Sequence, residues 1–96
     1  MKIDIKKLKG TEFQKRVWRE LLKISKGSTV TYKELAKMIG EPMSIRAVAN
    51  AVGANPCPPH IPCHRVIRSD GSLGGYSGKG GIKTKKALLI KEGVKV

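Results

Sequence analysis

Cysteine and histidine side chains gather in the stretch NPCPPHIPCHRV, where Cys57, His60, Cys63 and His64 fall within eight residues. These side chains can bind zinc, form a disulfide, pack in a core, or act as a nucleophile and its base. Zinc sites usually join two ligand pairs across a longer separation, and prolines stiffen this stretch, so we expect no metal site. A disulfide is disfavoured because cells keep thiols reduced. A reactive thiol and a core position both remain open for Cys63, and Cys57 is most simply a small buried hydrophobe.

A reactive Cys63 would need a base beside it and a third group to orient that base. The thiolate is the nucleophile, and a neighbouring histidine and positive charge both favour it. Neighbouring side chains on an extended strand point to opposite sides, so His64 would reach Cys63 through a water unless the backbone turns there. Of the late acids, Asp70 is better explained by a turn, which leaves Glu92 to orient His64. From its local sequence alone, a solvated surface acid is the more ordinary role for Glu92.

Capping patterns and apolar periodicity predict the elements that would position these side chains. The first ten residues could form a short edge strand. A helix is predicted over 11–24, where Thr11 and Gln14 match a capping box and apolar residues recur at helical spacing. The aromatic residues of this segment are assigned to core packing.

Two further helices follow with a tight turn between them. The segment TYKELAKMIG predicts a helix over 31–40 that begins with a second capping box and ends at Gly40, a left-handed C-terminal cap. Ser44 is then predicted to cap a third helix over 45–54. This order is the outline of a helix-turn-helix.

The chain changes character after residue 54. Prolines exclude a helix over 55–62. The segment RVIRSDGSLGGY predicts a hairpin with Asp70 and Gly71 at its turn. A glycine-rich loop that lacks the P-loop pattern then leads into a last helix over 84–93. We expect one domain over 1–96, mostly α with a small β-hairpin: a winged-helix-like helix-turn-helix domain with an active-site loop.

Charge indicates a polyanionic partner. The chain has 96 residues, with 20 Lys and Arg against 7 Asp and Glu, a net charge of +13. In one small domain such an excess favours nucleic acid, although lysines also serve solubility. The alanine-rich third helix is slim enough to approach a groove, although alanine also simply favours helices and lets them pack tightly. Arg46 projects from its first turn. No apolar run is long enough to span a bilayer and the N-terminus lacks a secretory pattern, so we expect an intracellular protein (cytoplasm, or nucleus in a eukaryote) without a membrane partner.

A longer signature resembles one known family. The segment NPCPPHIPCHRVIRSDGSLGGYSG, with GTEFQKRVWRELLKISKGSTVTYKELA and RAVANAVGANP before it and LLIKEG after it, is similar to the O6-alkylguanine-DNA alkyltransferases (methylated-DNA–protein-cysteine methyltransferases). The likeness covers 10–93. It implies a single-turnover DNA-repair methyltransferase that moves an alkyl group irreversibly from guanine O6 to its own cysteine, needs no cofactor, and flips the damaged nucleotide out of double-stranded DNA.

The resemblance also implies roles for single residues. Cys63 would accept the alkyl group, and His64, through a water, would deprotonate it. Glu92 would orient His64. Asn55 would brace the active-site loop against the helix-turn-helix. Tyr32 would hydrogen-bond the guanine ring and help the leaving base to accept a proton.

Further residues would bind the substrate base and the DNA. In the family the third helix enters the minor groove, and Arg46 would fill the gap that the flipped nucleotide leaves. The resemblance also assigns three residues to the substrate pocket: Tyr76, Ser77 and Val66. It assigns four more to contacts with the DNA: Ser44, Ala47, Thr31 and Ala51. We expect a monomer.

The chain also departs from the family. Members usually carry an additional N-terminal domain, so the sequence suggests the C-terminal catalytic and DNA-binding domain alone. The loop GKGGIKTKK is longer than expected, and no substrate-contacting lysine is assigned within 79–86. The rival hypotheses are a lesion-binding module like the alkyltransferase-like relatives, which lack the acceptor cysteine, a Cys–His hydrolase, and a transcription factor that uses the helix-turn-helix.

Overall fold

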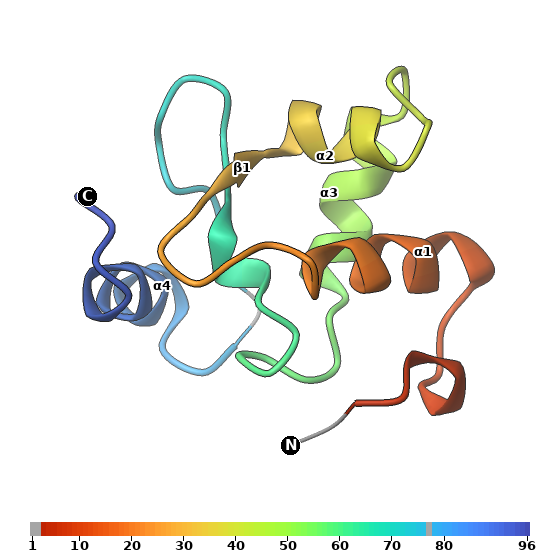
Figure 1. Cartoon of the computed structure of the whole chain (residues 1–96), viewed down its shortest axis with the longest axis horizontal. Coiled ribbons are helices and arrows are strands. Elements are labelled where there is room, and N and C mark those ends of the chain that lie inside the picture. Colours follow the sequence, from red (N-terminus) through yellow and green to blue (C-terminus); the bar gives the residue numbers. More distant parts are fainter. Residues whose placement is uncertain (1–2, 77) are drawn as a thin grey trace.

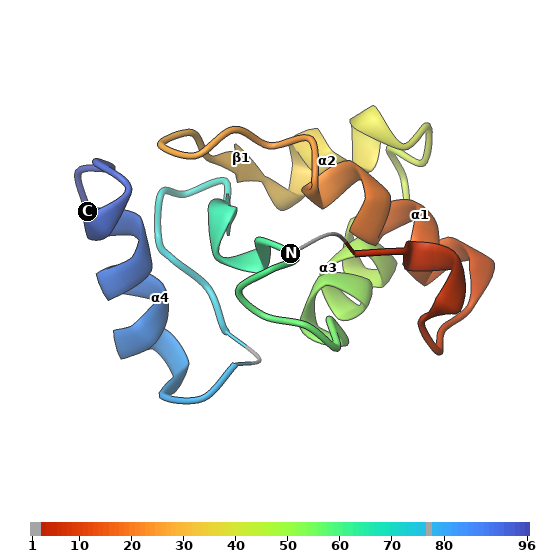
Figure 2. The same ribbon diagram turned by 60° about the horizontal axis from the view of Figure 1, so that its bottom comes forward.

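The helices of the chain form two unequal groups with a small sheet between them. The computed structural model describes residues 3–76 and 78–96. A bundle is formed by the 3₁₀ helix η1 (Ile5–Lys7) and the helices α1 (Glu12–Leu21), α2 (Tyr32–Met38) and α3 (Ile45–Gly53). Figure 1 and Figure 2 both show the last helix, α4 (Gly81–Lys91), on the far side of the 3₁₀ helix η2 (Cys63–Arg65) and the strands β1 (Val30–Thr31) and β2 (Val66–Ile67).

Both predicted capping boxes are confirmed. At the start of α1, the Gln14 backbone N–H donates to Thr11 Oγ1 at 3.0 Å, and the Thr11 N–H donates to Gln14 Oε1 at 2.9 Å. At the start of α2, the Glu34 N–H donates to Thr31 Oγ1 at 3.0 Å and Glu34 Oε1 accepts in return at 2.8 Å. These boxes satisfy N–H groups that have no partner within the helix, so they fix where α1 and α2 begin.

The helix-turn-helix is confirmed, with one difference at its turn. Gly40 ends α2 with a φ of +79°, a left-handed conformation that favours glycine. The Glu41 N–H then returns to the Ala36 carbonyl at 2.9 Å. Ser44 directly precedes α3, but its side chain makes no capping hydrogen bond. Its φ of −109° and ψ of 37° depart from the extended conformation of a typical N-cap, so the predicted side-chain cap is wrong.

The core lies where α1 crosses α3. Trp18 is 1% exposed, and its indole N–H donates to the Ala51 carbonyl of α3 at 2.9 Å. Gly10 comes so close to this ring that a β-carbon there would lie 2.6 Å from it. Aliphatic side chains from α1, α2, α3, the segment before β2 and β2 itself complete the core: Val17, Leu21, Leu35, Val48, Val52, Ile61 and Val66.

Two expectations about β-structure are wrong, although the mainly helical class is confirmed. The segment expected as an N-terminal edge strand contains η1. Asp70 and Gly71 do form a turn, since the Gly71 N–H donates to the Arg68 carbonyl at 3.0 Å, but β2 pairs in parallel with β1 and not within a hairpin. Val30 faces Val66 in this register. Pairing with a strand so distant in sequence depends on tertiary packing, which no local turn signal encodes.

The ends of two helices also differ from expectation. α1 ends at Leu21 and not at residue 24, and α4 begins at Gly81 and not at residue 84. No helix in the described residues is long and apolar enough to cross a membrane.

Candidate active site

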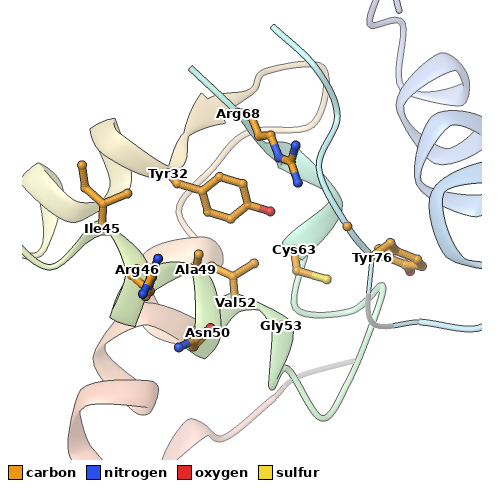
Figure 3. Close-up of a pocket in the computed structure, with 11 residues that line it drawn as sticks. Tyr32, Ile45, Arg46, Ala49, Asn50, Val52, Gly53, Cys63, Arg68 and Tyr76 are labelled. Atoms are coloured by element: carbon orange, nitrogen blue, oxygen red, sulfur yellow. The ribbon is translucent and has the colours of Figure 1, made fainter. Parts of the chain in front are cut away.

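Cys63 lies in the wall of a cavity of about 730 Å³ that opens between the helix-turn-helix and the segment after β2. The residue is 3% exposed and begins η2. Figure 3 shows it between the rings of Tyr32 and Tyr76, with α3 residues on an adjoining wall. The cavity thus joins a thiol, two phenols and the exposed helix of the helix-turn-helix, lined by Tyr32, Ile45, Arg46, Ala49, Asn50, Val52, Gly53, Cys63, Arg68, Gly75 and Tyr76.

His64 and Glu92 form a buried pair behind Cys63. His64 Nε2 lies 2.8 Å from Glu92 Oε2, and the two side chains are 2% and 10% exposed. Hydrogen bonds from Arg65, then the bond from His64, hold the pKa of Glu92 down from 4.5 to about 2. Since the carboxylate is therefore ionised at neutral pH, the Nε2–H must be the donor.

The other ring nitrogen of His64, Nδ1, differs from Nε2 in its surroundings. Nδ1 is buried and has no hydrogen-bond partner in the described part of the chain. Because Nε2 carries the proton of the neutral imidazole, Nδ1 has the free lone pair and can accept a proton. Cys63 and His64 share the 3₁₀ turn of η2, so the extended strand assumed from the sequence is wrong here, and strand alternation no longer argues for a bridging water.

Asn55 spans the loop that leads to Cys63. Its side chain is buried, Nδ2 donates to the Ile61 carbonyl at 2.6 Å, and Oδ1 accepts from the Cys57 N–H at 3.0 Å. This geometry braces the proline-rich loop from within. Cys57 is half-buried and His60 is exposed, and neither lines the cavity.

The two tyrosines keep their protons readily. Burial, and then the charge of the Cys63 thiolate, raise the pKa of Tyr32, while Arg68 lowers it. The same two causes raise the pKa of Tyr76. A phenol that stays protonated is a hydrogen-bond donor, so both tyrosines can donate to a molecule bound in the cavity.

The residues assigned to DNA occupy different environments. Arg46 and Ala47 are exposed on α3, and Ser44 is half-buried before it. Thr31 is half-buried and its hydroxyl is engaged in the α2 cap. Ala51, in contrast, is 2% exposed and faces Trp18 in the core, so the structure does not bring it to the surface.

Two of the residues assigned to the substrate pocket also need comment. Val66 is fully buried and takes no part in lining the cavity. Ser77 lies outside the described residues.

Lys85 is a buried cation near Tyr32 that sequence reasoning missed. It is fully buried in α4, and its ammonium donates to the carbonyls of Val66, Leu73 and Gly75 and lies 5.9 Å from the centre of the Tyr32 ring. Burial lowers its pKa from 10.5 to about 8, while the Cys63 thiolate opposes this shift. Lys85 thus ties β2 to the segment that carries Tyr76. Its place four residues before the buried Leu89, on the same helix face, was the available sequence signal.

Comparison with known proteins identifies the family. Residues 12–94 match the family described as "6-O-methylguanine DNA methyltransferase, DNA binding domain". The chain belongs to this family. It is 52% identical over 85 residues to a methylated-DNA–protein-cysteine methyltransferase of Mycobacterium tuberculosis, covering 88% of this chain and 50% of that protein. It is 54% identical over 84 residues to the protein of that name from Methanothermobacter thermautotrophicus, covering 88% and 46%. The chain spans about half the length of these relatives.

Solved structures agree with the family assignment. The M. tuberculosis OGT structure in complex with DNA superposes with a TM-score of 0.84 at 52% identity, over 88% of this chain and 52% of that chain. The S. pombe Atl1 structure in complex with damaged DNA containing O6-carboxymethylguanine superposes with a TM-score of 0.78 at 32% identity, over 92% and 82%. The family and its alkyltransferase-like branch therefore share this fold.

We expect the stability that Glu92 contributes to the fold to be lost at acid pH. Its pKa is depressed to about 2 in the folded chain, so its stabilisation is complete above the unfolded value of 4.5 and is lost as pH falls through 2. We expect Glu92→Gln to lower the Tm at neutral pH, with the difference from wild type shrinking across that acid window. Thermal melts followed by circular dichroism measure this. The exposed Glu12→Gln is the control, and a Glu92→Gln difference that stays constant with pH would contradict the assignment.

We expect substitution of the buried Lys85 to destabilise the fold, and substitution of its exposed neighbour Lys86 to have little effect. Lys85→Met keeps the apolar stem but leaves three carbonyls without their donor, so we expect the free energy of unfolding to fall by more than about 2 kcal/mol. Lys86→Met, at an exposed position, should change it by less than about 0.5 kcal/mol. Urea unfolding measures the change in each variant. Equal midpoints for the two variants would show that the buried ammonium does not contribute to the stability of the fold.

Proposed function

We propose that this chain is the catalytic and DNA-binding domain, the C-terminal one, of an alkyltransferase that repairs O6-alkylguanine in double-stranded DNA. The observation that carries the proposal is that Cys63, with the His64–Glu92 pair behind it, shares one cavity with the exposed side of α3. A binding module would need neither a cysteine in the cavity wall nor, on the next residue, a buried imidazole nitrogen that no described residue occupies. The M. tuberculosis relative, whose structure contains DNA, supports DNA as the partner.

The proposed reaction is a single displacement. The Cys63 thiol gives its proton to His64 Nδ1, directly or through a water, and the thiolate attacks the alkyl carbon on O6. The carbon–sulfur bond forms as the carbon–oxygen bond breaks, and the bonding electrons of the latter pass to the guanine. Tyr32, whose raised pKa keeps its hydroxyl protonated, is placed to donate to the leaving base. A thioether has no easy hydrolytic exit, so each molecule reacts once.

The DNA must present its damaged base outside the stack. The O6 atom of a paired guanine lies at the major-groove edge, and an in-line attack on its substituent cannot occur within the duplex. Arg46 lines the cavity from the first turn of α3 and is exposed, so it can enter the space that a flipped nucleotide leaves. The net charge of +13 supplies attraction to phosphates. We propose binding through the minor groove by a monomer.

Lesion recognition without transfer is the second candidate function. It is favoured by the likeness to S. pombe Atl1, of which this chain covers 82%. The presence of Cys63 in the cavity wall favours transfer instead.

Mass spectrometry separates these functions. After incubation with a duplex containing O6-methylguanine, we expect one added methyl group per chain, on the peptide that contains Cys63, and no second turnover. Cys63→Ser should bind the duplex without gaining mass. Tight binding of wild type with no change in mass would establish the lesion-binding function, and repeated turnover would indicate a hydrolase.

Arg46 can be tested by comparing two substrates. Unstacking a nucleotide costs a few kcal/mol, so Arg46→Ala should slow the reaction with duplex by roughly ten- to a hundredfold and leave the reaction with free O6-methylguanine base nearly unchanged. Arg19→Ala removes the same charge from α1, away from the cavity lining, and should have a small effect on both. Equal losses on the two substrates in Arg46→Ala would rule out a role in flipping. Single-turnover rates provide the measurement.

A further inference from the structure

Arg65 holds the carboxylate that orients His64. It follows His64 in η2, and its side chain is 15% exposed. Arg65 Nε donates to Glu92 Oε1 at 2.9 Å and Nη2 donates to Glu92 Oε2 at 2.8 Å. The remaining terminal nitrogen, Nη1, donates to the Ile24 carbonyl at 2.8 Å. The planar guanidinium is thus fixed at both ends, and the Glu92 carboxylate is held as a bidentate partner.

One oxygen atom of Glu92 serves both neighbours. Oε2 accepts from His64 Nε2 and from Arg65 Nη2, each at 2.8 Å. A carboxylate held only by His64 could rotate about its terminal bond, because that torsion is soft. The two-point contact with Arg65 removes this freedom and leaves Oε2 directed at Nε2.

We propose that Arg65 is a positioning residue for the transfer reaction: it holds Glu92 so that the proton of neutral His64 stays on Nε2 and Nδ1 remains free to accept the Cys63 proton. The inference rests on the proposed function, because only a reacting thiol needs that nitrogen. In the other tautomer, Nδ1 would carry the proton and could not act as the base. The energy that separates the tautomers comes from the Nε2–H bond to an ionised, immobile acceptor.

Electrostatics gives the same assignment. The charged and titratable groups that act on Glu92 are Arg65, the leading cause of its depressed pKa, and His64. Burial acts in the opposite direction, so without Arg65 the carboxylate would be more easily protonated. A protonated Glu92 could donate as well as accept, so it would no longer require a proton on His64 Nε2. The preference for the Nε2-protonated tautomer would then be lost.

The bond to Ile24 extends this arrangement to the bundle. Ile24 is buried just after α1, whereas Glu92 lies at the end of α4. Arg65 therefore connects the two helical groups through η2. A purely structural role for this bridge predicts a loss of stability but no change in the state of the imidazole, which makes the two roles separable.

The decisive experiment observes the imidazole nitrogens of the whole chain by ¹⁵N NMR at about pH 8, where an unperturbed histidine is neutral. We expect His64 to be a single Nε2-protonated tautomer in wild type, with the exposed His60 as an internal reference. Arg65→Gln should give a mixture of tautomers, and Arg65→Lys, which keeps the charge but loses the fork, a smaller admixture. Arg16→Gln is the matched control, since Arg16 also donates to a main-chain carbonyl, that of Ile39, and pairs with a glutamate, Glu41. None of these three residues lines the cavity that contains Cys63.

A chemical readout accompanies the spectra. In a Cys57→Ala background, the rate at which iodoacetamide alkylates Cys63 reports thiolate formation without DNA. We expect Arg65→Gln to slow it roughly tenfold at neutral pH, with part of the rate restored in Arg65→Lys. Arg16→Gln should react as wild type does.

The outcomes separate this inference from the proposed function. A single, unchanged tautomer together with a rate within about twofold of wild type in Arg65→Gln would overturn the positioning role, whatever happens to the Tm. If Arg65→Gln does not fold, the same two results in Arg65→Lys overturn it. Neither readout uses alkylated DNA, so a wild-type protein that takes no methyl group from the duplex would refute the proposed function while leaving the role of Arg65 tested.

Discussion

A single carboxylate joins the two halves of this fold to its reactive centre. Glu92, at the end of α4, is bound by His64 and Arg65 of η2, and Arg65 continues to the segment after α1. Without this contact α4 would lose its ion pair with η2, and the His64 imidazole would lose its carboxylate partner. The same ion pair is thus a structural clamp and, in the proposed reaction, also part of the chemistry.

Lys85 makes a second polar contact between α4 and the rest of the chain. Its ammonium donates to three carbonyls, in β2 and in the segment before Tyr76, so that a buried charge replaces the regular ladder that a hairpin would have supplied. Burying a charge is unfavourable unless its hydrogen bonds are satisfied, and here all three ammonium donors have partners. Two buried or nearly buried ions, Lys85 within α4 and Glu92 at its end, therefore tie this helix to β2, to the segment before Tyr76 and to η2.

The Cys63 thiol and α3 face the same cavity for a topological reason. The first residue of α2, one side of α3 and the start of η2 converge where the parallel pair β1–β2 holds the middle of the chain against the bundle. Each of these elements is short, so the side chains at their ends lie close together. This convergence places Arg46 and Cys63 around one volume of about 730 Å³, which is the basis of the proposed binding of a flipped base.

Local sequence determined the parts of this protein that depend on neighbouring residues. The capping boxes at Thr11 and Thr31, the left-handed Gly40, the helix-turn-helix and the pairing of His64 with Glu92 were all predictable, the last through the family signature. Tertiary structure alone decided the parallel strand pair, the turn that carries Cys63, and the burial of Ala51, Val66 and Lys85. Capping and turn energies act over three or four residues, so they can be read from the local sequence. Strand pairing and the burial of a charge depend on contacts between distant parts of the chain. The cost of desolvating a buried group and the hydrogen bonds that offset it arise only once the fold has formed.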